Sequence, residues 1–103
     1  MYRFLELSVT NNIAVGTFNR PESLNALSCD FLKEIEVLIS HLTSEKEIQV
    51  VIFTGNGKAF IAGADISEMV DMNAAEGTLF GGYGQKVFLK LENMPKPTIA
   101  AIN

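Results

Sequence analysis

The most informative segment of this sequence is Lys58-Ala59-Phe60-Ile61-Ala62-Gly63-Ala64-Asp65-Ile66. It follows an apolar, β-branched run over 50–54 and a turn at Gly55-Asn56-Gly57, and it leads into a short helical pattern. Small residues here leave backbone N–H groups open to a ligand. A helix that begins here adds the positive end of its dipole. The stretch therefore predicts a strand-to-helix loop that can hold a developing negative charge.

The same loop has a second interpretation, a tight turn without a ligand, because Gly-rich turns are common. Asp65 and Glu68 have the spacing of a capping box, with Asp in place of the usual Ser or Thr. We therefore expect Asp65 to cap a helix and not to act as a catalytic acid. We expect Ile66, Met69 and Val70 to form the apolar side of that helix.

Before the loop, the sequence predicts a hairpin and a helix. Two alternating runs over 4–10 and 13–18 indicate strands, with Asn11-Asn12 in the turn between them. Ser28 is a good N-cap for the helix that follows. The next strand, over 49–53, is nearly all apolar, so we expect it to be buried on both faces. The apolar face of the helix consists of Phe31, Leu32, Ile35, Leu38, Ile39 and Leu42.

After the loop, the sequence predicts a second long helix and a last strand. The segment 73–84 is Gly-rich, and we expect the helix to begin at about Glu76 or later and to end at Asn93. The run 98–102 indicates another buried strand. The expected order is ββα, β, αα, β, an α/β chain. The apolar stripe of the second helix consists of Val87, Phe88, Leu91 and Met94.

Composition excludes several classes of protein. The chain has 103 residues, 48% of them hydrophobic and 19% charged, which argues against disorder. Its net charge of -4 argues against nonspecific binding to nucleic acid. The sole cysteine, Cys29, gives no intrachain disulfide, so we expect a cytoplasmic protein. We find no signal peptide and no apolar run that could cross a membrane, and we expect no membrane partner.

Three segments together resemble the crotonase superfamily, the enoyl-CoA hydratases and isomerases. They are Asn19-Arg20-Pro21 with Leu24-Asn25-Ala26-Leu27, then Phe60-Ile61-Ala62-Gly63-Ala64-Asp65-Ile66, and finally the run from Met94 to Asn103. Their order and spacing match that family along essentially the whole chain. The resemblance implies the N-terminal part of a crotonase-like ββα spiral, truncated before the second oxyanion-hole segment, with residues 1–103 as one portion of a single domain.

The resemblance also implies a site and a substrate. The backbone N–H of Ala64 would be one of two oxyanion donors for a thioester enolate. The substrate would be an acyl-CoA thioester, most simply a 2-trans-enoyl-CoA that is hydrated, with no separate cofactor and no metal. By resemblance we also expect a homo-oligomer, a trimer or hexamer. The residues expected to contact substrate or CoA are Leu24, Ala26, Ala62, Gly63, Ala64, Asp65 and Ile66.

The family chemistry needs groups that the resemblance places beyond Asn103, namely the second donor and the acidic residues. We therefore expect the 103-residue chain alone to be inactive. One alternative is that the polypeptide ends at Asn103 and is an inactive CoA-binding or subunit-interaction fragment. Another is an unrelated α/β domain whose loop binds a different anion. Arg20 and Lys58 could meet CoA phosphates, but lone basic residues near turns are usually solvated.

Overall fold

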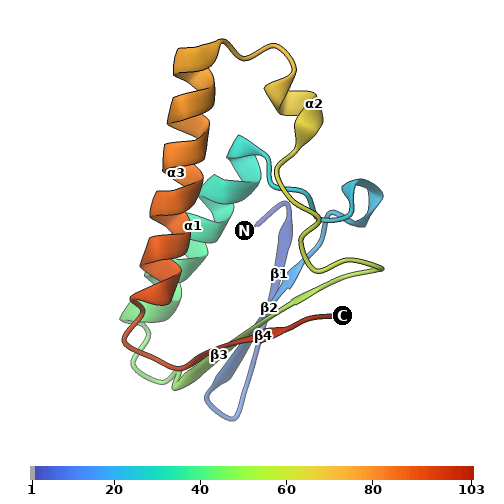
Figure 1. Ribbon diagram of the computed structural model, residues 1–103. Coiled ribbons are helices and arrows are strands. Elements are labelled where there is room, and N and C mark those ends of the chain that lie inside the picture. Colours follow the sequence, from blue (N-terminus) through green and yellow to red (C-terminus); the bar gives the residue numbers. More distant parts are fainter. Residues whose placement is uncertain (1) are drawn as a thin grey trace.

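The computed structural model describes residues 2–103, and its four strands form one mixed sheet (Figure 1). The strand order in the sheet is β1-β2-β3-β4; β1 is antiparallel to β2, and the other neighbours are parallel. This confirms the α/β class and the expected order of elements, with one short 3-10 helix, η1 (Pro21–Ser23), added. The strands are β1 (Leu5–Thr10), β2 (Ile13–Phe18), β3 (Val50–Gly55) and β4 (Thr98–Ala101).

The hairpin between β1 and β2 turns at Asn11-Asn12, as predicted. Both asparagines have positive φ, 52° and 67°, which a two-residue turn between right-twisted strands requires. Thr10 faces Ile13 directly across the turn. The register of the first strand pair is therefore set by this turn.

Helix α1 (Cys29–Ser44) lies across one face of the sheet and builds the core with it (Figure 1). The Ser28 hydroxyl accepts a hydrogen bond from the N–H of Phe31 at 3.1 Å, which confirms the predicted N-cap. All six residues of the predicted apolar face are buried. Phe18 of β2 is central to the core, because its ring contacts those of Phe31, Phe53 and Phe60.

The expectation that β3 is buried on both faces is wrong. Val51 and Phe53, on the face beneath α1, are 0% and 3% exposed. Ile52 and Thr54, on the opposite face, are only half-buried. The apolar composition of β3 indicated two covered faces, but in residues 2–103 the helices pack over one.

Helix α3 (Ala74–Glu92) begins before the predicted position and includes the Gly-rich segment. Its start is fixed by a capping box. The Asn73 side chain accepts from the N–H of Glu76 at 2.8 Å, and the Glu76 carboxylate accepts from the N–H of Asn73 at 3.1 Å. This box offsets the low helix propensity of the glycines that follow. The apolar stripe is confirmed for Val87 and Met94, which are buried, but Phe88 is 37% exposed.

A polar bridge joins α3 to α1. The Tyr83 hydroxyl donates to Glu36 Oε1 at 2.9 Å, and Lys90 Nζ contacts Glu36 Oε2 at 2.8 Å. Hydrogen bonds from Lys90 and Tyr83 hold the pKa of the Glu36 carboxyl below its usual value. Burial, together with the bond to Glu36, raises the pKa of Tyr83 to about 12.

The last strand is not buried, which corrects the prediction for 98–102. All four residues of β4 are exposed, because it is the edge strand and no helix of the described chain covers it. Its start is anchored by Lys96, whose Nζ donates to the carbonyls of Leu42 and Glu45, each at 2.6 Å. Lys96 thereby satisfies carbonyls at the C-terminal end of α1. Among residues 2–103, no helix is long and apolar enough to span a membrane.

Asn25 joins the turn after β2 to the turn after β3. Its side chain is fully buried, and its φ of 57° is in the left-handed region. Oδ1 accepts from the N–H of Arg20 at 2.7 Å. Nδ2 donates to the carbonyls of Asn56 at 3.1 Å and Ala59 at 2.9 Å. One side chain therefore supplies a partner to three backbone groups of two loops.

Replacing Asn25 should destabilise the protein strongly. In Asn25→Ala the three backbone groups lose their partner, and we expect the free energy of unfolding to fall by about 2–4 kcal/mol. In Asn25→Gly the free energy of unfolding should fall by about 1 kcal/mol less than in Asn25→Ala, because glycine adopts the positive φ without a Cβ clash. Urea unfolding measures both. Asn93→Ala is the control, since that exposed side chain makes no hydrogen bond in the described chain. Equal stability of Asn25→Ala and the wild type would refute the role given to Asn25.

The Glu36 bridge should make stability depend on acid pH. Because the folded-state pKa of Glu36 is lowered, its contribution is present above the unfolded value of 4.5 and is lost as pH falls through the folded value. Glu36→Gln should remove this part, so its unfolding free energy should drop less than that of the wild type between pH 5 and pH 3. The difference is expected to be about 1 kcal/mol or less. Urea unfolding across that range measures it, with Glu47→Gln, an exposed carboxylate, as control. Parallel curves for wild type and Glu36→Gln would contradict this assignment.

Candidate functional site

The loop before α1 and the loop after β3 run side by side through a parallel bridge between Leu27 and Ala64. The Leu27 N–H donates to the carbonyl of Gly63 at 2.8 Å, and the Leu27 carbonyl accepts from the N–H of Asp65 at 2.9 Å. In such a bridge the residue opposite Leu27 directs its own N–H away from it. The N–H of Ala64 therefore points outward, and it donates to no protein acceptor within residues 2–103.

Most of the residues predicted to contact CoA lie along these two loops. Leu24, which has a φ of 53°, accepts from the N–H of Ala62 at 3.1 Å, and Ala26 is half-buried two residues later. The structure thus brings the two predicted segments together, although they are separated by more than 30 positions in the sequence. The N–H groups of Ala62 and Asp65 are already hydrogen-bonded, so these two residues do not offer a free backbone donor as Ala64 does.

Gly63 gives the second loop the shape that exposes Ala64. Its φ is 142°, a conformation that residues with a side chain rarely adopt. No atom lies within 4 Å of the place where a Cβ would stand, so the glycine is required here by the backbone and not by crowding. Gly63, Ala64 and Ala62 are all exposed.

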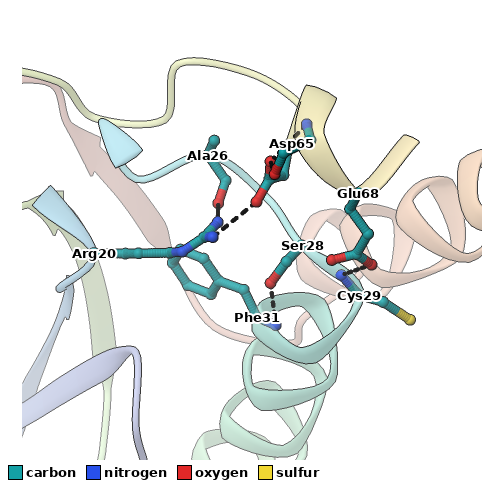
Figure 2. A network of polar contacts seen from close by, with 8 residues as sticks. Arg20, Ala26, Ser28, Cys29, Phe31, Asp65 and Glu68 are labelled. Carbon is teal, nitrogen blue, oxygen red and sulfur yellow. Dashed lines mark hydrogen bonds and ion pairs between the residues drawn. The ribbon is translucent and has the colours of Figure 1, made fainter. Parts of the chain in front are cut away.

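An ion pair fastens the first loop to the start of α2 (Ile66–Met69) beneath this surface (Figure 2). Arg20 Nη2 lies 2.8 Å from Asp65 Oδ2, and Arg20 Nη1 donates to the carbonyl of Ala26 at 2.9 Å. The two side chains are only 18% and 11% exposed. Arg20 is therefore not the solvated residue that the sequence indicated, and its guanidinium is occupied inside the protein.

Asp65 is a helix cap, as predicted. Its Oδ1 accepts from the Ser67 hydroxyl at 2.6 Å and from the Ser67 N–H at 3.0 Å. These bonds, chiefly that from the Ser67 hydroxyl and then those from Arg20, hold the pKa of the Asp65 carboxyl below its usual value. Asp65 is therefore ionised at neutral pH and is engaged on both oxygens, so it is not placed as a proton donor.

The predicted capping box between Asp65 and Glu68 does not form. The Asp65 N–H is bound to Leu27, and Glu68 Oε1 instead accepts from the N–H of Cys29 at 2.8 Å (Figure 2). Glu68 thus satisfies a free donor at the N-terminus of α1. The spacing of Asp65 and Glu68 was compatible with a capping box, but the tertiary fold brings the N–H of Cys29 close to Glu68, and the Glu68 carboxylate accepts from that donor instead.

The apolar residues of α2 face outward and do not join the core. Ile66 is 75% exposed, Val70 71% and Met69 41%. They follow Ala64 closely in the sequence and are exposed apolar side chains. The helix has only one turn, so its dipole adds less to the site than the sequence suggested.

Residues 2–103 contain no group of three or more His, Cys, Asp or Glu side chains that could hold a metal ion. Sequence reasoning missed two side chains that hydrogen-bond the backbone of the turn before this site, Asn25 and Asn103. Both lie in the segments that carried the family resemblance. Asn25 is fully buried, with 0% exposure, and a buried polar side chain usually has a structural role. The burial of a polar residue in a turn cannot be deduced from the local sequence pattern.

The sequence matches the family model described as enoyl-CoA hydratase/isomerase over residues 8–103. It is 51% identical to the short-chain-enoyl-CoA hydratase of Clostridium acetobutylicum over 98 residues, which are 94% of this chain and 38% of that protein. It is 42% identical to the crotonyl-CoA hydratase of Syntrophomonas wolfei, over 99% of this chain and 40% of that protein.

The fold is similar to the crystal structure of an enoyl-CoA hydratase from Bacillus anthracis, with a TM-score of 0.95 and 32% identity over 98% of this chain and 40% of that one. The chain thus spans about two fifths of the length of these relatives. Since the family model covers nearly all of the sequence and the fold agrees, the chain belongs to the enoyl-CoA hydratase/isomerase family, within the crotonase superfamily.

Proposed function

We propose that this chain provides the first oxyanion donor of an enzyme that adds water to 2-trans-enoyl-CoA thioesters. The observation that carries the proposal is the backbone N–H of Ala64, which is exposed, points outward from the Leu27 bridge and has no protein acceptor within residues 2–103. Two relatives named as hydratases support the choice of reaction. The second hypothesis, an isomerase of the same family, shares this donor.

The chemistry follows from where negative charge develops. Addition of a water oxygen to C3 of the enoyl group pushes electrons onto the thioester oxygen, giving an enolate, which then takes a proton at C2. A fixed N–H that meets this oxygen stabilises the enolate more than the neutral carbonyl, so it lowers the barrier. The donor sits in a loop held by hydrogen bonds at Leu24 and Leu27, so little reorganisation is needed during the reaction.

The proton transfers need groups other than the two carboxylates nearest to Ala64. Asp65 is bound by Ser67 and Arg20, and Glu68 is bound by the N–H of Cys29. A general acid or base needs a pKa near the working pH and a free position at the substrate. The proposal therefore assigns no acid or base within residues 2–103.

For substrate contact we propose the exposed faces of the two loops. Leu24 is 48% exposed and Ile66 is 75% exposed, so both offer apolar surface to the pantetheine or acyl part of the thioester. Ala26, Ala62 and Gly63 expose backbone with little side chain in the way. Absence of a separate cofactor, assembly as a trimer or hexamer and a cytoplasmic location stay predictions.

The alternative is a non-catalytic role, as a CoA-binding or subunit-interaction fragment. The relatives named above are about two and a half times as long. We expect the isolated 103-residue chain to produce no hydration of crotonyl-CoA, followed by loss of the enoyl thioester absorbance. The intact mass of the natural protein, compared with 11.3 kDa, shows whether further residues exist. Measurable turnover by the isolated chain would contradict this expectation, and an inactive natural protein of that mass would support the alternative.

Removal of the Ala64 N–H should slow hydration by the natural protein. Replacing Ala64 by L-lactic acid through peptide ligation turns the Gly63–Ala64 amide into an ester. This deletes the N–H and keeps the methyl side chain, and it also weakens the Gly63 carbonyl that accepts from Leu27. We expect kcat to fall by roughly 10²–10³-fold, because this is the usual effect of losing one oxyanion donor. Ala64→Gly is the matched control, because it retains the N–H. If the ester variant turned over crotonyl-CoA as fast as the control, Ala64 would not be an oxyanion donor.

A further inference from the structure

The chain segment after β4 is bound to the turn after β3. The two strands are parallel neighbours, so their C-terminal ends lie at the same edge of the sheet. There the Asn103 side chain makes three contacts across the turn. Oδ1 accepts from the N–H of Gly55 at 3.2 Å, and Nδ2 donates to the carbonyls of Gly57 at 2.7 Å and Ala59 at 3.3 Å.

This turn is tight and is held from both sides. A Cβ on Gly55 would stand 2.4 Å from the carbonyl oxygen of Ala59, so the backbone folds closely back on itself. The same Ala59 oxygen accepts from Asn25 at 2.9 Å and from Asn103 at 3.3 Å. Asn25 comes from the loop before α1, and Asn103 comes from the end of β4. The carbonyl therefore receives one amide from each side of the turn.

We propose that Asn103 is a positioning residue for the oxyanion donor, an inference that rests on the proposed function. Ala59 begins the segment that leads to Ala64. Between them, Phe60 packs edge-on against Phe18 at 5.3 Å, and the Ala62 N–H is bound by Leu24. Asn103 fixes the start of this segment relative to the sheet, and the Leu27 bridge fixes its end. The direction of the Ala64 N–H depends on both attachments.

The chemistry of the contacts requires an asparagine. An aspartate of the same size keeps the acceptor for Gly55 but loses both donors and places a carboxylate oxygen against the carbonyls of Gly57 and Ala59. That repulsion should move the turn without changing the core, because Asn103 is exposed and its side-chain hydrogen bonds go only to this turn. A small misplacement of a catalytic group can slow a reaction by about 10²-fold.

Asn103→Asp in the natural protein tests this inference, with Asn93→Asp as the matched control on an exposed side chain that has no hydrogen bond in the described chain. We expect kcat for crotonyl-CoA hydration to fall about 10- to 100-fold and KM to change less than about 3-fold. The backbone amide NMR signal of Ala64 should also shift without substrate, whereas Asn93→Asp should leave kcat and this signal unchanged.

The two measurements separate the inference from the function it rests on. If the wild type hydrates crotonyl-CoA and Asn103→Asp has the same kcat, Asn103 is not a positioning residue. If the wild type shows no hydration, the proposed function fails. The Ala64 amide signal alone then decides whether Asn103 positions this loop. A shift in Asn103→Asp then supports the placement of this loop by Asn103, and an unchanged signal overturns it.

Discussion

The buried amide of Asn25 is the interaction on which the arrangement of the loops depends. Two loops leave the same end of the sheet from neighbouring strands; the first contains only the short 3-10 helix η1, and the second contains no helix or strand before α2. Asn25 bonds three backbone groups of these loops at once, and its own φ is positive. These bonds join the starts of the two loops, and the bridge from Leu27 to Ala64 joins them again further along the chain.

Much of this fold could be predicted from the sequence because local residue patterns indicate its strands, turns and helices. The hairpin follows from Asn11-Asn12, the start of α1 from Ser28, and its buried face from the spacing of six apolar residues. The start of α3 was harder to predict, because a capping box at Asn73 stabilises a helix where the glycines of the sequence indicated a loop. The exposure of β4 and of one face of β3 depends on which other elements cover these strands. The composition of a strand shows how apolar it is, but it does not show which elements pack against it.

The candidate site was partly predictable for the same reason. The outward N–H of Ala64 follows from a loop of small residues, but the partners of the charged residues around it do not. Arg20, Asp65 and Glu68 lie within or beside the predicted motifs, and each one is bound to a group far away in the sequence or in a neighbouring turn. The spacing of residues along the sequence does not show which of several possible partners a charged side chain will bind. These charged side chains near Ala64 in the sequence therefore hold the loops together, and the exposed large apolar side chains of the candidate site include Leu24 and Ile66.

The proposed use of a main-chain donor at Ala64 has a consequence for how this protein can vary by inheritance. A side-chain donor can be lost through many codon changes, whereas an amide hydrogen survives every amino-acid replacement except proline. Substitutions at this codon can therefore alter the shape of the surface and the set of molecules that fit it, while the donor itself persists. Selection for a new substrate can act on this position without first losing the amide that we propose as the oxyanion donor.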